Sequence, residues 1–215
     1  MDAPQRKLSD IRNEYMLREL DEKNIRKNPL EQLQIWLDEA IESKVCEPTA
    51  MDLATVSGEG KPSLRVVLLK GIEDGLVFFT NYLSRKGKQI TENPHAAINF
   101  FWAELERQVR VEGKIVKVSK VESEIYFKSR PEMSRIGAHV SRQSEKLASR
   151  KQLEDAMKAK SKEFEGKDIP LPNYWGGYKL IPEYFEFWQG RPSRLHDRIY
   201  FELIDGKWEM GRLMP

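Results

Sequence analysis

Cysteine is almost absent from this sequence, which has only Cys46 among 215 residues. A single thiol excludes an intrachain disulfide and a cysteine-based zinc cluster, and this composition is typical of a reducing compartment. The sequence also lacks an apolar run long enough to span a bilayer, and its polar first residues form no apolar signal region. We therefore expect a soluble, cytoplasmic protein.

An excess of charge of one sign is also missing, because 36 Lys and Arg residues nearly balance 34 Asp and Glu residues. The net charge of +2 gives no global reason to expect a nucleic-acid or membrane partner. The sequence has no G-x-G-x-x-G, P-loop, H-E-x-x-H or G-x-S-x-G motif. These absences disfavour Rossmann-type dinucleotide binding, nucleotide hydrolysis, zincin chemistry and α/β-hydrolase chemistry, and no metal site is expected.

Hydrophobic residues make up 40% of the chain, enough for one substantial core, so we expect one domain over residues 1–215. Residues 1–27 are polar and predict a flexible arm, part of which could fold over a site as a lid: Arg12, Asn13, Glu14 and Tyr15. Several short strands with a few separate helices predict an α+β fold, mainly antiparallel β, in which a barrel carries peripheral helices.

Capping and turn signals predict the scaffold. Asn28, Pro29 and Glu31 are typical of a helix start. The expected buried face of this helix is Leu30, Leu33, Leu37, Ala40 and Ile41. A Gly-Glu-Gly-Lys turn predicts a hairpin between strands at 51–57 and 62–70. Further strands are expected at 76–81, 96–102, 104–118 and 208–213, and further helices after Ser84, Ser119 and Ser149.

Residues 64–70 are apolar on both faces, which predicts a strand buried on both sides. Arg65 and Lys70 lie near its two ends, where each would need an anionic partner if buried or would simply emerge into solvent. The two residues have opposite parity, so their side chains would point to opposite faces of a regular strand. To meet one ligand they would need a bulge, a strand end or a second subunit.

Ser84 is followed by Arg85, Lys86 and Lys88 in the first turns of the expected helix. Cations are unfavourable at a helix N-terminus, whose dipole prefers negative charge. Free N–H groups, a cap hydroxyl and these cations would together bind a phosphate. A tolerated surface charge run is the alternative interpretation.

Tyr126, Arg130 and Ser134 are spaced by four residues, and Pro131 should end one helix and begin another between them. A phenol, a guanidinium and a hydroxyl at a helix junction could form a second phosphate site. An exposed polar face explains the pattern equally well.

Residues 186–198 predict a strand, a Gly/Pro loop and a second strand that carries Arg194, His196 and Arg198 on one face, with Leu195, Ile199, Phe201 and Leu203 on the core face. This basic face could bind an anion and handle protons through His196, the group that titrates nearest neutral pH. A solvent-exposed basic strand is the alternative.

Taken together, these motifs resemble the pyridoxine/pyridoxamine 5′-phosphate oxidase family. The matching segments, in family order, are Arg65-Val-Val-Leu-Leu-Lys70, Phe79-Thr-Asn81, Ser84-Arg-Lys86, Arg107-Gln-Val109, Tyr126, Ser129-Arg-Pro131, Gln143-Ser144, Trp175-Gly-Gly177, Glu186-Phe-Trp-Gln-Gly190 and Arg194-Leu-His-Asp-Arg198. The resemblance implies a Greek-key-like split β-barrel, a homodimer, and FMN at the subunit interface.

The resemblance also implies the site residues. Those expected to hold FMN are Arg65, Val66, Val67, Leu68, Leu69, Lys70, Phe79, Thr80, Ser84, Arg85, Lys86, Gln108, Gln143, Ser144, Trp188 and Arg198. Those expected to hold the substrate are Arg12, Asn13, Glu14, Tyr15, Lys70, Tyr126, Arg130, Ser134, Arg194, Leu195 and His196. Arg194 and His196 would be the catalytic pair, and His196 would either polarise the reacting oxygen or nitrogen or accept a proton from it.

The implied activity is FMN-dependent oxidation of pyridoxine 5′-phosphate and pyridoxamine 5′-phosphate to pyridoxal 5′-phosphate, with O₂ reduced to H₂O₂. Two alternatives stay open at this point. A related split-barrel flavoprotein would keep the FMN residues but act on another substrate, and a carrier of flavin or pyridoxal phosphate would bind without turnover.

Overall fold

The computed structural model describes residues 15–215, so the predicted lid residues Arg12, Asn13 and Glu14 lie outside the described chain. The chain divides into two compact units. One unit contains the described chain up to Pro48 together with Phe101–Val109 and Phe185–Pro215. The other contains Thr49–Phe100 and Arg110–Tyr184. We call them the terminal unit and the central unit.

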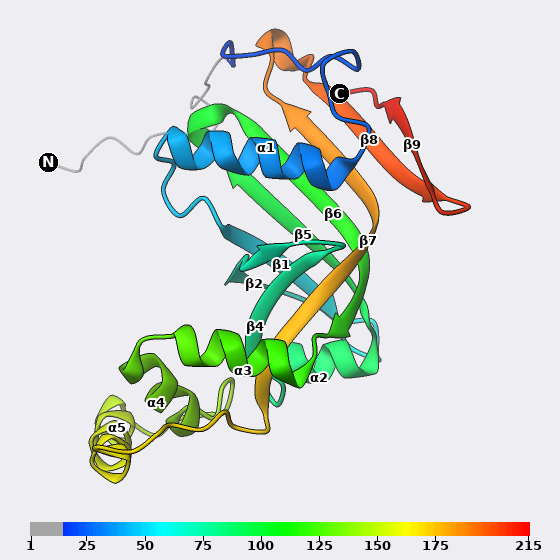
Figure 1. Ribbon diagram of the computed structural model, residues 1–215. Helices are drawn as coiled ribbons and strands as arrows, with labels where there is room; N and C mark the ends of the chain where they lie inside the picture. The colour runs from blue at the N-terminus through cyan, green and yellow to red at the C-terminus, as the bar shows by residue number, and fades with distance from the viewer. Residues whose placement is uncertain (1–14) are drawn as a thin grey trace, which may run out of the picture. The chain divides into compact units, whose positions relative to one another are not determined.

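Antiparallel strands dominate both units (Figure 1). The strands are β1 (Ala50–Val56), β2 (Pro62–Leu68), β3 (Gly71–Ile72), β4 (Leu76–Asn81), β5 (His95–Trp102), β6 (Arg107–Lys117), β7 (Trp175–Gln189), β8 (Asp197–Ile204) and β9 (Lys207–Arg212). The strand order is β2-β1-β5-β6-β7-β4-β3, and β8 pairs with both β7 and β9. The expected fold class, a mainly antiparallel split barrel with peripheral helices, is confirmed by this topology and by the structural relatives described below.

The helices begin where the capping signals predict. They are α1 (Pro29–Glu42), α2 (Arg85–Glu92), α3 (Lys120–Ser129), α4 (Glu132–Val140) and α5 (Arg150–Phe164). The side chain of Asn28 accepts a hydrogen bond from the Leu30 amide at the start of α1. Ser119 and Glu122 form a complete capping box on α3. In α1, Leu33, Leu37 and Ala40 are buried as expected, whereas Ile41 is exposed.

The prediction that residues 64–70 are buried on both faces is wrong. Strand β2 stands at one end of the strand order, paired with β1, and it alternates between exposed and half-buried residues. Leu64 and Val66 are 64% and 63% exposed, respectively. Lys70 lies beyond the last residue of β2, and its amide bonds to the Val77 carbonyl. The strand end therefore removes the parity conflict between Arg65 and Lys70.

The second strand of the 186–198 motif begins only at Asp197, so the prediction that Arg194 and His196 share a strand face with Arg198 is also wrong. Pro192–Arg194 is a short 3₁₀ turn, and Ser193 and Arg194 adopt left-handed backbone conformations with φ of 57° and 62°. Leu195 and Leu203 are exposed instead of buried, whereas Ile199 and Phe201 are buried as expected.

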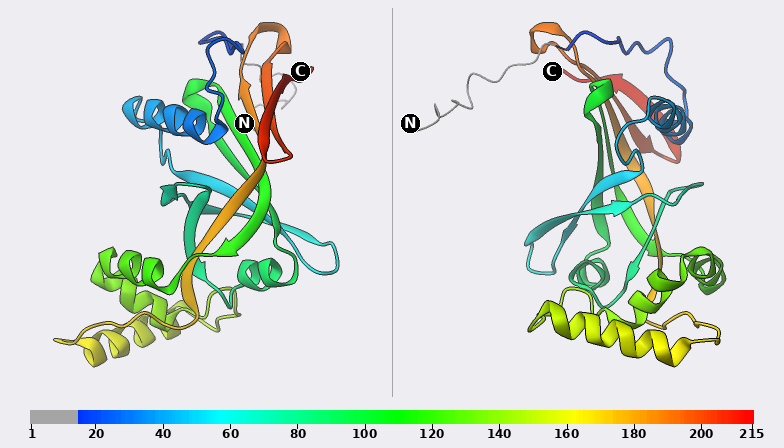
Figure 2. Two further views of the ribbon diagram at one scale, coloured as in Figure 1. Left: turned by 45° about the vertical axis from the view of Figure 1, so that its right-hand side comes forward. Right: turned by 90° about the vertical axis from the view of Figure 1, so that its left-hand side faces the viewer.

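Helices α3, α4 and α5 of the central unit share a small apolar core (Figure 2). Phe127 and Ile136 are fully buried there against Trp175, and Met157 and Phe164 of α5 pack at the edge. Pro131 separates α3 from α4, as the sequence predicts. This junction places Tyr126, Arg130 and Ser134 around one cavity. Across residues 15–215, no helix combines the length and the apolar character needed to traverse a bilayer.

Candidate active site

The largest group of predicted ligand-binding residues surrounds a cavity of about 520 Å³ in the central unit. Strands β2 and β4, helices α2 to α4, and the start of β7 supply its walls. The predicted residues that line it are Val66, Val67, Leu68, Lys70, Phe79, Thr80, Lys86, Tyr126, Arg130, Ser134 and Gln143. Expected cofactor contacts and expected phosphate contacts of the substrate thus lie in one space, whose lining is both cationic and aromatic.

Arg65 does not line this cavity but is held next to it by neutral oxygens. Its Nη1 donates to the Leu53 carbonyl at 2.8 Å and to Thr55 Oγ1 at 2.7 Å. Its Nη2 donates to Ser63 Oγ and, at 3.4 Å, to Gln89 Oε1. Burial lowers the pKa of Arg65, and the charge of nearby Arg85 lowers it further. The guanidinium is therefore oriented by the protein without neutralisation of its charge.

Lys86 is the buried cation of the cavity, with 8% of its surface exposed. Its Nζ donates to Thr80 Oγ1 at 3.1 Å and to Gln143 Oε1 at 2.8 Å. Burial lowers the pKa of Lys86 to about 8, with a further contribution from the Arg65 charge. A buried ammonium beside a guanidinium, with neutral partners within residues 15–215, is the arrangement that an anionic group would stabilise.

The segment Ser84-Arg85-Lys86 forms the start of a helix, as predicted. Ser84 caps α2 by accepting a hydrogen bond from the Gly87 amide, and no acidic residue stands in the first turn. Lys86 points into the 520 Å³ cavity. Arg85 instead lines a neighbouring cavity of about 500 Å³ with Lys88 and Ser144, and Gln143 belongs to both. The expected anion-binding helix start therefore serves two adjoining spaces.

Arg130 carries the clearest sign of a ligand-binding role. Its Nη1 is buried and has no hydrogen-bond partner within residues 15–215. The guanidinium carbon lies 4.6 Å from the Trp175 ring centroid, a cation–π contact that fixes its plane. Burial lowers the pKa of Arg130. Because a buried, unpaired guanidinium donor is costly, a phosphate in the cavity would satisfy it.

Three stacked rings form the apolar wall of the cavity. Tyr126 lies 3.9 Å from Phe79 at an interplanar angle of 16°, and Phe79 lies 5.7 Å from Trp175 at 13°. Gly177 permits this stack, since a Cβ there would come within 2.8 Å of the Phe79 ring. The wall offers a flat aromatic surface beside the cations, which suits a planar ligand that carries a phosphate.

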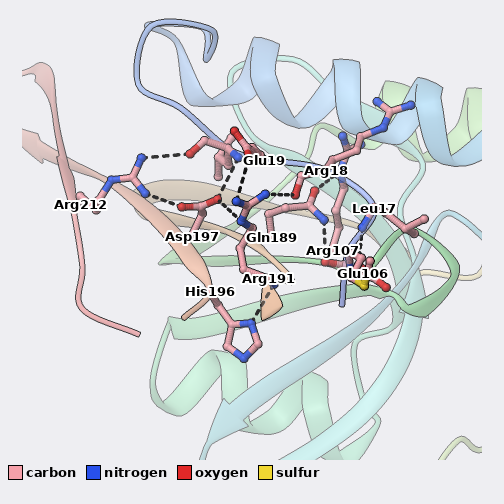
Figure 3. Close-up of polar contacts among 12 residues, drawn as sticks. Leu17, Arg18, Glu19, Glu106, Arg107, Gln189, Arg191, His196, Asp197 and Arg212 are labelled. Carbon is pink, nitrogen blue, oxygen red and sulfur yellow. Dashed lines mark hydrogen bonds and ion pairs between the residues drawn. The ribbon is translucent and has the colours of Figure 1, made fainter. Parts of the chain in front are cut away.

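Leu69 is buried in the central unit and does not line the cavity, and the other remaining predicted site residues of the described chain belong to the terminal unit. Arg194 and Leu195 are exposed, and His196 and Trp188 are half-buried with ring centroids 4.7 Å apart. The Tyr15 ring lies 5.7 Å from both of these rings. Gln108 is half-buried, and Arg198 forms an ion pair with Glu186. Figure 3 shows polar contacts near His196, among them those of Arg191 and Asp197.

Sequence reasoning missed several residues that build the central cavity. Trp175 fixes Arg130, and its only sequence signal was the Trp-Gly-Gly motif at the start of β7. Thr55 and Gln89 orient Arg65, and their hydroxyl and carbonyl oxygens are themselves joined at 2.6 Å. Such residues have no distinctive sequence pattern, because each is an ordinary polar side chain on a strand or helix.

A metal does not fit the site as well as an organic anion. Within residues 15–215, no group of three or more His, Cys, Asp or Glu side chains is suited to hold a metal ion. The cavity lining instead combines cations, hydroxyls, an amide and aromatic rings. These groups fit FMN, since its phosphate requires cations and its isoalloxazine ring requires a flat or apolar surface.

Comparison with known proteins defines the class first. The structure is similar to that of PhzG from Burkholderia lata in complex with tetrahydrophenazine-1-carboxylic acid, with a TM-score of 0.85, 30% identity, and coverage of 90% of this chain and 95% of that one. An FMN-binding, pyridoxamine 5′-phosphate oxidase-related protein from Nostoc punctiforme gives a TM-score of 0.69 at 17% identity and covers 89% of this chain and 100% of that one. The fold is the FMN-binding split barrel.

Sequence comparison identifies the family. The pyridoxamine 5′-phosphate oxidase family matches residues 37–161, and the pyridoxine 5′-phosphate oxidase C-terminal dimerisation region matches residues 175–215. A pyridoxine/pyridoxamine 5′-phosphate oxidase from Cytophaga hutchinsonii is 56% identical over 97% of this chain and 98% of its own length. One from a Cyanothece species is 49% identical, with coverage of 97% and 98%. The chain belongs to the pyridoxamine 5′-phosphate oxidase family.

Proposed function

We propose that the protein oxidises pyridoxine 5′-phosphate and pyridoxamine 5′-phosphate to pyridoxal 5′-phosphate, with FMN as its cofactor and O₂ as the electron acceptor that becomes H₂O₂. The observation that carries this proposal is the unpartnered Arg130 donor in a cavity that also holds Lys70, Lys86 and a stack of aromatic rings. Family membership and near-complete alignment with relatives named as these oxidases support it.

The cations of the central cavity would divide between two phosphates. Lys86, with Arg65 beside it, would hold the FMN phosphate together with Thr80 and the Ser84 end of α2. Lys70, Tyr126, Arg130 and Ser134 would hold the substrate phosphate, and all four line the cavity. Anchoring the phosphate converts binding energy into orientation of the distant reacting carbon. Bound FMN supplies the hydride acceptor.

The terminal unit would supply the residues that act on the substrate ring. We propose that Arg194, Leu195 and His196 contact the pyridine ring, that Tyr15 covers it, and that Trp188, Arg198 and Gln108 contact FMN. Because Arg194 and Leu195 are exposed, they are available to a ligand. Burial lowers the pKa of His196, and the neighbouring Arg194 charge lowers it further, so both effects favour the neutral imidazole.

We propose a homodimer with FMN at the subunit interface. The match of residues 175–215 to a dimerisation region supports this assembly. So does β2, where Leu64, Val66 and Leu68 present apolar side chains to solvent in the isolated chain. Val66 and Leu68 also line the central cavity, so a subunit that covers β2 would lie beside the ligand.

A related flavoprotein with another substrate is the main alternative, since PhzG has the same fold. Tyr126, Arg130 and Ser134 line the cavity together with Lys70. This group of phosphate-binding side chains favours a phosphorylated substrate such as pyridoxine 5′-phosphate. A substrate without a phosphate would leave the buried Arg130 donor unsatisfied.

Visible absorption of the FMN-loaded protein tests the proposal. Anaerobic addition of pyridoxine 5′-phosphate should bleach the flavin band, and air should restore it with formation of H₂O₂. Pyridoxine without its phosphate is the matched control and should bleach far more slowly. A flavin that binds but is not bleached would move the assignment to another flavoprotein or a carrier. Failure to bind FMN would contradict the proposal as a whole.

A further inference from the structure

The loop that carries His196 is held in an unusual conformation. It runs from Gly190, directly after β7, to Asp197, the first residue of β8, and we call it the histidine loop. Ser193 and Arg194 are consecutive non-glycine residues with positive φ. This conformation is unfavourable for a non-glycine residue and persists only where surrounding contacts require it. The contacts that hold this loop therefore bear on what His196 does.

One hydrogen bond determines the protonation pattern of the His196 ring. The backbone N–H of Arg191 donates to His196 Nδ1 at 3.1 Å. A backbone amide always carries its proton, so Nδ1 must be an acceptor, and the neutral ring must carry its proton on Nε2. Figure 3 shows that the second ring nitrogen points away from the polar cluster. That nitrogen is free to donate a hydrogen bond to a ligand.

Arg191 is fixed in turn by the N-terminal segment of residues 15–22, which we call the strap. Its Nη2 donates to Glu19 Oε1 at 2.7 Å, and its Nη1 donates to the Arg18 carbonyl at 3.3 Å. Its Nε lies 3.5 Å from Asp197 Oδ2. The Arg191 side chain is 28% exposed, whereas that of its partner Glu19 is 76% exposed, so this ion pair lies at the surface. These contacts fix the first arm of the histidine loop.

Asp197 fixes the other arm of the loop to the same strap (Figure 3). Its Oδ2 accepts a hydrogen bond from the Leu20 amide at 3.1 Å, and its Oδ1 accepts one from Arg212 at 2.7 Å. Arg212 also donates to the Leu20 carbonyl and to both carboxylate oxygens of Glu22. Arg191 and Asp197 therefore hold the two sides of His196 through one network.

Aromatic packing limits rotation of the ring itself. The His196 ring contacts Trp188, at 4.7 Å, and Tyr15, at 5.7 Å between centroids, and these two rings also contact each other at 5.7 Å. Gly190 makes room for Tyr15, because a Cβ at position 190 would lie 2.7 Å from Tyr15 Cγ. The charged and titratable groups around the imidazole are Arg191, Arg194 and Asp197 of the loop and Tyr15 of the strap.

We propose that Arg191 is a positioning residue that holds His196 in its Nε2–H form, so that His196 donates a hydrogen bond to an electron-rich oxygen or nitrogen of the substrate and does not accept its proton. This inference rests on the proposed function, and it selects one of the two roles left open for His196. If Nδ1 were protonated, its proton would face the Arg191 amide proton at hydrogen-bond distance. This repulsion disfavours the doubly protonated imidazolium.

Nitrogen-15 NMR of the imidazole side chains in the FMN-loaded protein tests the proposal without substrate. The chain has three histidines, so the His196 signals can be assigned by their loss in His196→Asn. At neutral pH we expect a proton on Nε2 and an unprotonated, hydrogen-bonded Nδ1. A proton on Nδ1, or a doubly protonated ring, would overturn the inference. Because this measurement needs no turnover, it separates failure here from failure of the proposed oxidation.

A pair of arginine variants supplies the kinetic test. Arg191→Ala should give tautomer-averaged His196 signals and slow flavin reduction about 10- to 100-fold, with FMN affinity unchanged. Arg191→Lys should recover part of the rate, because it keeps a cation near Glu19 and Asp197. Arg18→Ala is the matched control, since this strap side chain pairs with Glu39 and contacts Arg191 only through its backbone. Wild-type signals and rates in Arg191→Ala would refute the positioning role.

Discussion

Glu186 and Arg198 form a two-point ion pair in the terminal unit. Arg198 Nε donates to Glu186 Oε1 at 2.8 Å, and Nη2 donates to Oε2 at 3.0 Å. The Glu186 side chain is 3% exposed and that of Arg198 is 27% exposed. The remaining Nη1 donates to the Met214 carbonyl near the C-terminus. The pair joins β7 to β8 on either side of the histidine loop.

Glu186→Gln should destabilise the protein, because it removes the charge partner of a partly buried guanidinium. We expect the free energy of unfolding to fall by about 1–3 kcal/mol. Glu183→Gln is the control. Glu183 pairs with Lys114 at 3.3 Å, but both side chains are about half exposed, so its loss should cost less than about 1 kcal/mol. Urea unfolding of the two variants measures the difference, and equal losses would contradict the argument.

Lys86→Met should separate cofactor binding from stability. Removal of the buried ammonium should leave the cofactor-free protein as stable as the wild type, or more stable, while the dissociation constant for FMN rises about 10- to 100-fold. The exposed Lys128→Met is the control and should change neither quantity. Flavin fluorescence titration and thermal unfolding measure the two effects. An unchanged FMN affinity would remove Lys86 from the phosphate site.

The lowered pKa of Lys86 should also make the stability of the cofactor-free protein depend on pH. The pKa of Lys86 is about 8 in the folded protein against an ordinary value of 10.5. Between these values the unfolded chain binds more protons than the folded chain, so stability should rise with pH through this window. Lys86→Met should abolish that rise in the cofactor-free protein, and Lys128→Met should keep it.

Arg130→Lys should weaken recognition of the substrate phosphate. Lysine keeps the positive charge but loses the planar donor set and the stacking on Trp175. We expect KM for pyridoxine 5′-phosphate to rise about 10- to 100-fold, whereas slow turnover of unphosphorylated pyridoxine should be unchanged. Steady-state kinetics with both substrates checks this. Equal effects on the two substrates would indicate a structural role for Arg130.

Leu64→Arg should prevent subunit association, since it places a charge in the exposed apolar face of β2. We expect sedimentation velocity to show a monomer and FMN affinity to fall with it. Val121→Arg is a matched control on α3, because Val121 is 65% exposed and Leu64 is 64% exposed. A dimer in the Leu64 variant would exclude β2 from the interface.

Acid should release the strap before it unfolds the protein. Hydrogen bonds from Arg212 lower the pKa of Glu22 to about 2 from its ordinary value of 4.5. A depressed carboxylate pKa contributes stability above the unfolded value, and this contribution is lost as pH falls from 4.5 towards 2. Because Glu22 is 39% exposed, solvent screening makes the effect small.

Hydrogen exchange at the Leu20 amide measures that release, since this N–H donates to Asp197. After correction for intrinsic rates, exchange should accelerate between pH 5 and pH 3. Glu22→Gln should exchange faster already at pH 5 and show a weaker pH dependence. Exchange that is the same in both proteins at every pH would show that Glu22 does not hold the strap.

Local signals explain why much of the scaffold could be predicted from sequence. Asn28, Ser84 and Ser119 each cap the helix that follows, because a short polar side chain can satisfy the free amides of the first turn. Pro131 ends α3, because a ring without an N–H cannot continue it. These rules involve neighbours within four residues, so they depend little on the rest of the fold.

The errors arose where the local sequence pattern does not determine the structure. An apolar edge strand such as β2 has the same sequence pattern as a buried strand, because both avoid polar residues. The alternation from Arg194 to Arg198 starts within a turn, where Ser193 and Arg194 have left-handed backbone conformations that a period-two pattern does not reveal. The group that bonds to His196 Nδ1 is a backbone amide, which every residue except proline has, so the sequence does not mark it. Trp175 contacts Arg130 from 45 positions away in the sequence, so no local pattern connects the two residues.

Gly190 has a genetic consequence. Every missense change in its codon introduces a side chain with a Cβ, and that carbon would collide with Tyr15 and crowd Glu106 Cβ at 3.0 Å. The Glu106 carboxylate accepts hydrogen bonds from the Met16 and Leu17 amides, so this collision reaches the anchor of the strap. Even the smallest replacement at codon 190, alanine, should therefore impair the protein.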